Sequence, residues 1–216
     1  MKSYNHIIFD LDGTISDPGL GITNSIMYAL KKFGMESERD NLYKFIGPPL
    51  RETFRNHFGF SRENAELAVK YYREYFSKKG IYENVLYPDM KELLQKLHSA
   101  GKRLYIATSK PLEYTLIILE HFEIRSNFTF ISGSNMDGSM SEKSELIGRI
   151  APIIGIEFFD KTIMVGDRVY DIEGAKHHKI DSAAVLYGYG DFLELKEAEP
   201  VYLIKSIEEL SSFLLG

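Results

Sequence analysis

The strongest constraint on the fold is an alternation that runs from residue 88 to the end of the chain. Short apolar runs, typical of buried strands, alternate there with segments whose apolar residues recur at helical spacing. The expected strands lie at 104–107, 128–131, 162–165, 182–186 and 201–204, and residues 4–9 read as one more strand. This alternation predicts the α/β class, with a Rossmann-like and mostly parallel sheet.

Residues from about 17 to 84 contain helical patterns and no strand pattern. Gly47-Pro48-Pro49 interrupts the block, because a helix interior does not run through consecutive prolines, and Ser61 has the side chain of an N-cap for the helix that follows it. The strand at 4–9 has no sheet partner before residue 100, so we interpret the block as an insertion. The predicted domains are an α/β core at 1–16 and 85–216 and an all-helical domain at 17–84.

Composition excludes several kinds of chemistry. The 216 residues include no cysteine, which rules out disulfides, thiolate nucleophiles, zinc–thiolate sites and iron–sulfur clusters. The formal charge of −5 argues against binding to a nucleic-acid polymer. No apolar run reaches the ~18 residues of a membrane span, and none resembles a signal-peptide core. We therefore expect a cytoplasmic protein without membrane contact.

Polar side chains follow the expected strands at the points where the strands end. In an open α/β sheet the ligand site lies beyond the carboxyl ends of the strands, so these side chains should converge at one edge. They are carboxylates, hydroxyls and lysines: Asp10, Asp12, Thr108, Ser109, Lys110, Lys143, Asp167 and Asp171. Taken singly, each could be a turn residue, a helix cap or a surface lysine. Their shared placement favours a single site.

The clustered aspartates suggest a cation and phosphate chemistry. Carboxylates brought together repel one another unless a cation lies among them, and an all-oxygen ligand set suits Mg²⁺. Asp10 and Asp12 are two residues apart in an extended segment, so both can point the same way. One could attack phosphorus while the other moves protons, with Thr108 and Lys143 holding phosphate oxygens.

Four motifs resemble those of the haloacid dehalogenase superfamily, in its phosphoglycolate-phosphatase-like branch with a helical cap. Asp10-Leu11-Asp12-Gly13-Thr14 matches the first motif, Thr108 the second, Lys143 the third, and residues 166–171 the fourth. The residues at 46–50, 107–111 and 187–190 are most similar to those of members described as 5′-nucleotidases.

The resemblance implies roles for these residues. Asp10 would attack phosphorus to form an aspartyl-phosphate, and Asp12 would act as general acid and then general base. Mg²⁺ would be held by Asp10, the Asp12 backbone carbonyl and Asp167, with Asp171 in support. The transferring phosphoryl group would be bound by Thr108, Ser109 and Lys143. In the cap, Arg51 is the candidate for contact with the rest of the substrate.

The implied function is a Mg²⁺-dependent hydrolase of a small phosphorylated metabolite, such as a nucleoside 5′-monophosphate. A phosphoglycolate phosphatase and a sugar-phosphate mutase are alternatives within the same branch. Outside it, a phospho-accepting signalling domain or a non-catalytic binding domain would use similar residues. True dehalogenases lack the second aspartate of the first motif, so Asp12 disfavours them. We expect a monomer or a weak homodimer.

Overall fold

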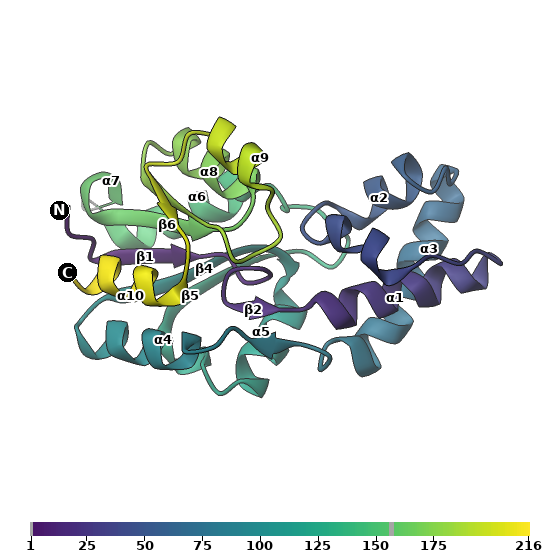
Figure 1. Ribbon diagram of the computed structural model, residues 1–216, viewed down its shortest axis with the longest axis horizontal. Helices are drawn as coiled ribbons and strands as arrows, with labels where there is room; N and C mark the ends of the chain where they lie inside the picture. The colour runs from purple at the N-terminus through teal and green to yellow at the C-terminus, as the bar shows by residue number, and fades with distance from the viewer. Residues whose placement is uncertain (1, 156–157) are drawn as a thin grey trace. The chain divides into compact units, whose positions relative to one another are not determined.

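The computed structural model describes residues 2–155 and 158–216. The chain divides into two compact units, shown in Figure 1. The α/β unit contains residues 1–16 and 86–216, and the helical unit contains residues 17–85. Across the described residues, no helix combines the length and the apolar character needed to cross a membrane.

The α/β unit is built on one six-stranded sheet with the strand order β5-β4-β1-β6-β7-β8. Every neighbouring pair is parallel, which confirms the predicted sheet. The first strand of the chain lies in the middle, with His6 paired to Arg103 on one side and to Thr162 on the other. The strands are β1 (His6–Phe9), β4 (Arg103–Pro111), β5 (Phe128–Ser134), β6 (Thr162–Gly166), β7 (Asp181–Val185) and β8 (Tyr202–Ile204).

Helices cover both faces of this sheet. Figure 1 shows α6 (Lys143–Ile154) and α8 (Val169–His177) on one face, and α4 (Met90–Ser99) and α5 (Leu112–His121) on the other. The shorter helices of the unit are η4 (Arg125–Asn127), α7 (Phe158–Lys161) and α9 (Phe192–Glu197), and α10 (Ile207–Leu215) packs against α4. Ser206 caps this last helix, because Glu209 N donates to Ser206 Oγ at 3.1 Å.

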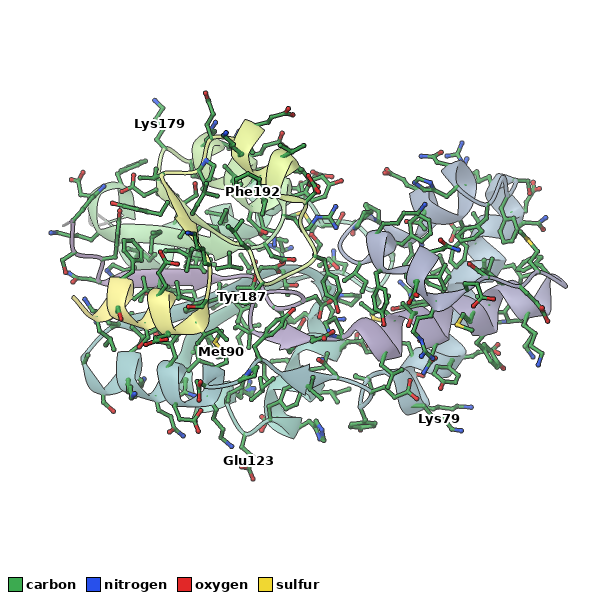
Figure 2. The ribbon with its side chains drawn as sticks, viewed as in Figure 1. Lys79, Met90, Glu123, Lys179, Tyr187 and Phe192 are labelled. Carbon is green, nitrogen blue, oxygen red and sulfur yellow. The ribbon has the colours of Figure 1, made fainter. Side chains whose placement is uncertain are left out.

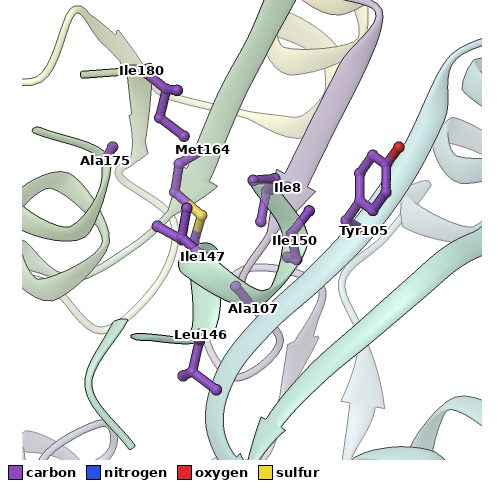
Figure 3. Close-up of a cluster of buried hydrophobic side chains, with 9 residues drawn as sticks. All are labelled: Ile8, Tyr105, Ala107, Leu146, Ile147, Ile150, Met164, Ala175 and Ile180. Atoms are coloured by element: carbon purple, nitrogen blue, oxygen red, sulfur yellow. The ribbon is translucent and has the colours of Figure 1, made fainter. Parts of the chain in front are cut away.

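The core of the α/β unit lies between the central strands and the α6–α8 layer (Figure 3). Ile8 of β1, Met164 of β6 and Ile147 of α6 are fully buried there. Strands buried on both faces read as continuous apolar runs, and this is why these strands could be found from the sequence. This packing between the strands and helices α6 and α8 positions the carboxyl ends of the strands.

The helical unit is a small bundle that contains a cluster of phenylalanine rings. Ser61 caps its α3 helix as predicted, since its side chain accepts from Asn64 N. Phe33, Phe54 and Phe60 pack together, with centroid separations of 4.6 Å and 5.9 Å for the two pairs that share Phe60. Its elements are α1 (Gly19–Lys32), η1 (Arg39–Asn41), η2 (Tyr43–Phe45), α2 (Leu50–Asn56), α3 (Arg62–Tyr75) and the π-helical turn η3 (Phe76–Gly80).

Two very short strands stand where the chain passes between the units. β2 (Ser16–Asp17) and β3 (Val85–Leu86) pair as a separate two-stranded sheet. These two strands were not predicted, because two residues are too few to display the alternation that identifies a strand.

Candidate active site

Asp10 and Lys143 form the centre of the candidate site. Asp10 follows β1 directly, and its N–H donates to Val165 O at 2.9 Å, which continues the pairing with β6. Lys143 is the first residue of α6 and is buried. Its Nζ lies 3.0 Å from Asp10 Oδ1 and 2.7 Å from Asp171 Oδ1, and it donates to Ala107 O at 2.9 Å. The lysine therefore joins the residue that follows β1 to the middle of β4 and to the first turn of α8.

Three buried carboxylates surround the same point. Asp10, Asp167 and Asp171 each place a carboxylate oxygen within 4.8 Å of the others. Asp167 accepts hydrogen bonds from Thr14 Oγ1 at 3.2 Å and from Tyr189 N at 2.8 Å. Asp171 accepts from Arg168 N at 3.0 Å. These bonds hold Asp167, which follows β6, and Asp171 of α8 beside Asp10, so three of the four aspartates predicted to converge lie together.

The pKa values of this cluster are consistent with a site that binds a cation. Burial, together with the charges of Asp10 and Asp171, raises the pKa of Asp167 well above its usual value. Burial also raises the pKa of Asp171 to about 6, although Lys143 opposes the shift. Burial lowers the pKa of Lys143, but Asp10 and Asp171 outweigh it and raise that pKa overall. If all three carboxylates are ionised, one lysine offsets only one of their charges, and oxygen ligands of this kind fit Mg²⁺.

Asp12 is placed differently from the other aspartates. Its Oδ2 lies 2.7 Å from Nζ of Lys110, and both side chains are largely buried. Its Oδ1 is buried and accepts no hydrogen bond from the described residues. Burial raises the pKa of Asp12, while Lys110 acts in the opposite direction. The Asp12 carboxylate is not part of the three-aspartate cluster, and the metal contact expected from its backbone carbonyl stays a prediction.

Thr108 and Ser109 lie at the end of β4, next to the cluster in the sheet. Thr108 is buried, and its Oγ1 accepts from Lys110 N at 3.3 Å. Its hydroxyl proton is thus still available for a ligand. Ser109 Oγ donates to Ser141 O at 2.7 Å. A hydroxyl has one proton, so a hydrogen bond from this hydroxyl to phosphate would have to replace the bond to Ser141.

The loop at 187–190, for which the sequence analysis predicted no role in the site, supports the aspartate cluster. Tyr187, labelled in Figure 2, donates its hydroxyl to Thr14 O at 3.1 Å. Tyr189 supplies the backbone N–H that holds Asp167. Gly188 and Gly190 pass so close to Asp167 that a Cβ at either position would collide with it. The repeated glycines in the Tyr-Gly-Tyr-Gly stretch were the available signal for this close approach.

Arg51 belongs to the helical unit, on α2. Its Nε lies 2.6 Å from Glu66 Oε1 of α3, and both side chains are partly exposed. The guanidinium lowers the pKa of Glu66. In this structure Arg51 thus joins two helices of its own unit, and a contact with substrate stays a prediction.

Comparisons with known proteins identify the family to which the chain is similar. A family model described as haloacid dehalogenase-like hydrolase matches residues 7–185. A 5′-nucleotidase from Pseudomonas aeruginosa is 38% identical over 212 residues, covering 98% of this chain and 96% of that protein. Tyrosine-protein kinase PtkA from Mycobacterium tuberculosis is 37% identical, covering 96% of this chain and 72% of that protein. A crystal structure of a predicted phosphatase from Clostridium acetobutylicum has a TM-score of 0.93 and 41% identity, with 99% of each chain covered.

Proposed function

The chain belongs to the haloacid dehalogenase-like hydrolase family, and from this premise we propose that it is a Mg²⁺-dependent phosphomonoesterase that works through an aspartyl-phosphate on Asp10. The observation that carries the proposal is the buried Lys143, which contacts Asp10 and Asp171 beside Asp167. Such a group of buried charges is costly unless it binds ligands of complementary charge.

In the proposed mechanism, the two aspartates of the first motif have different roles: one is the nucleophile and the other transfers protons. A carboxylate oxygen of Asp10 forms a bond to phosphorus while the ester P–O bond breaks. Asp12 gives a proton to the departing alkoxide and later takes one from the water that hydrolyses the aspartyl-phosphate. Lys143 and Thr108 bind the equatorial oxygens of the transferring group, where negative charge is concentrated.

Asp10, Asp167 and Asp171 would hold the Mg²⁺, since their oxygens already lie within 4.8 Å of one another. When bound, the ion would neutralise charge on the phosphoryl group and keep it in line with Asp10. The hydrogen bonds from Tyr189 and Thr14 to Asp167, and from Arg168 to Asp171, would orient these carboxylates for that task.

For the substrate we propose a nucleoside 5′-monophosphate, supported by the 5′-nucleotidase from Pseudomonas aeruginosa that resembles this chain along almost its whole length. The helical unit would act as the cap that selects the substrate, with Arg51 as the candidate contact. Phosphoglycolate and sugar phosphates are the competing substrates, and a mutase would rearrange a sugar phosphate without net release of phosphate.

The test is a phosphate-release screen with and without Mg²⁺ against nucleoside monophosphates, phosphoglycolate, sugar phosphates and ATP. We expect Mg²⁺-dependent release, fastest from a nucleoside monophosphate. Asp10→Asn should lower turnover by at least about 10³-fold, because the amide is a poor nucleophile. Asp40→Asn, at an exposed position of the helical unit, is the matched control and should keep full activity.

The outcomes separate the competing functions. Full activity in Asp10→Asn would exclude the aspartyl-phosphate mechanism. Release from phosphoglycolate alone would make the chain a phosphoglycolate phosphatase. A phosphorylated Asp10 that persists without turnover would instead support a phospho-accepting signalling domain.

A further inference from the structure

We propose that Lys110 is a positioning residue for Asp12: it anchors one oxygen of the Asp12 carboxyl group and leaves the other oxygen to carry the proton in both chemical steps. The inference rests on the proposed phosphomonoesterase mechanism and adds a residue to it.

The contact between the two side chains is close and sheltered from water. Nζ of Lys110 lies 2.7 Å from Oδ2 of Asp12, with side-chain exposures of only 6% and 15%. A charge-assisted hydrogen bond of this length, away from solvent, restricts the carboxyl group more than a surface ion pair would. The other oxygen, Oδ1, is buried and accepts no hydrogen bond from the described residues. One oxygen is held by Lys110, and the other has hydrogen-bonding capacity that the described residues leave unused.

An irregularity in the sheet sets the place of Lys110. Along β4 and β5, Thr108 pairs with Gly133 and the next pair is Pro111 with Ser134. Ser109 and Lys110 are therefore extra residues between consecutive pairs, and a bulge of this kind redirects the side chains it contains. Lys110 N donates to Thr108 Oγ1 at 3.3 Å, which ties the bulge to the end of the strand.

The two buried lysines of the site serve different aspartates. Lys143 pairs with Asp10 and Asp171, whereas Lys110 pairs with Asp12. The nucleophile and the proton carrier thus each have their own cation. Because Lys110 orients Asp12, the ammonium group of Lys143 remains available to bind the phosphoryl group.

The anchored geometry fits both steps of the reaction. In the first, the bond from Asp10 to phosphorus forms, the ester P–O bond breaks, and the leaving oxygen takes its proton from Oδ1 of Asp12. The resulting carboxylate is stabilised by the ammonium of Lys110. In the second step, a water oxygen bonds to phosphorus, the Asp10–phosphoryl bond breaks, and Oδ1 takes a proton from that water. The products are an alcohol and inorganic phosphate.

The experiment measures kcat/KM for Lys110→Met with two esters that differ in the need for a proton. A nucleoside monophosphate has a poor leaving group that must be protonated, whereas p-nitrophenyl phosphate releases a stable phenolate. We expect kcat/KM to fall about 10- to 100-fold for the nucleotide and no more than about 3-fold for the nitrophenyl ester. A pre-steady-state burst of nitrophenolate should also appear, because the second step still needs Asp12.

Three further variants complete the design. Lys110→Arg keeps the charge and should recover part of the nucleotide activity. Lys91→Met, which removes an exposed lysine paired with Glu123 at 3.0 Å, is the matched control and should behave as wild type. Adding Lys110→Met to Asp12→Asn should cause no further loss, because Lys110 acts through Asp12.

Other results would overturn the inference. Equal losses on both esters, or a further loss in the Asp12→Asn background, would mean that Lys110 binds the substrate directly. Equal losses accompanied by a large drop in the thermal unfolding midpoint would mean that it only stabilises the fold. Absence of turnover in the wild-type protein would instead remove the proposed function, and the inference with it.

Discussion

At the scale of single residues, the site stores unfavourable electrostatic energy that a ligand can relieve. Asp10, Asp167 and Asp171 are buried together, and Lys143 pairs with Asp10 and Asp171. When burial raises the pKa of a carboxyl group, its ionised form is less stable in the folded protein than in the unfolded chain. The metal-free protein should therefore lose stability as its carboxylates ionise.

This predicts how the stability of the metal-free protein changes with pH. Asp171 has a pKa of about 6 in the folded protein, and that of Asp167 is also raised. Between the ordinary pKa of about 4 and these values the folded state binds more protons than the unfolded state, so the free energy of unfolding falls as pH rises. We expect it to be about 1–3 kcal/mol lower at pH 7.5 than at pH 5, measured by urea unfolding in EDTA.

Mg²⁺ should reverse this trend. At pH 7.5 millimolar Mg²⁺ should raise the unfolding midpoint, and at pH 5 the gain should shrink because protons compete for the same oxygens. Asp171→Asn is the control and should flatten the pH dependence. A metal-free protein most stable at pH 7.5, with no response to Mg²⁺, would contradict the expected cation site.

At the scale of secondary structure, one glycine of β5 makes the bulge at the end of β4 possible. A Cβ on Gly133 would lie 2.8 Å from Leu112 Cα, 2.9 Å from Leu112 N and 3.0 Å from Lys110 O. All three are backbone atoms, which cannot move aside as a flexible side chain can. Gly133→Ala should therefore cost about 1–3 kcal/mol of stability and lower activity by displacing Lys110.

The matched control is Gly148→Ala. Gly148 lies inside α6, and its Cβ would meet His178 Cε1 at 3.4 Å, an ordinary contact. Alanine is the better helix former, so this variant should be neutral or more stable by up to about 1 kcal/mol. Urea unfolding of the two variants compares them directly, and equal effects would argue against the importance of the bulge.

The same elements show what can and cannot be predicted from sequence. The strands of the sheet and the N-cap at Ser61 were predictable, because apolar runs and capping residues are local patterns. The gathering of Asp10 and Asp167 followed from the rule that strand ends meet at one edge. The pairing of Lys110 with Asp12 was not predictable, because it depends on a bulge in a pairing between distant segments. Tyr189 holds Asp167 through its backbone, which side-chain identity does not reveal.

At the scale of the whole molecule, the candidate chemistry and the candidate selectivity belong to different units. Asp10, Lys110, Lys143 and Asp167 all lie in the α/β unit, and Arg51 lies in the helical unit. The chain leaves the first unit through β2 and returns through β3, and these strands pair with each other. Their ends are therefore close enough for a short linker.

Replacing residues 18–84 by a short glycine–serine linker should leave a folded α/β unit. The six-stranded sheet and its core lie entirely within that unit, so we expect cooperative unfolding and a Mg²⁺-dependent rise in the unfolding midpoint. Preference among phosphate esters should be lost, because the proposed cap is absent. Circular dichroism and thermal unfolding, compared with the full chain, provide the measurement. A shortened chain without a cooperative transition would show that the sheet depends on the helical unit.

The central position of β1 also has a consequence for how the protein is made. Residues 6–9 leave the ribosome well before their two neighbours in the sheet, β4 and β6, which begin only at residues 103 and 162. The helical unit is a continuous stretch and can fold while synthesis is still under way. The apolar strand β1 must meanwhile stay unpaired, and it is then accessible to chaperones and to other nascent chains. The strand that leads to the proposed nucleophile is thus synthesised long before the two strands that pair with it.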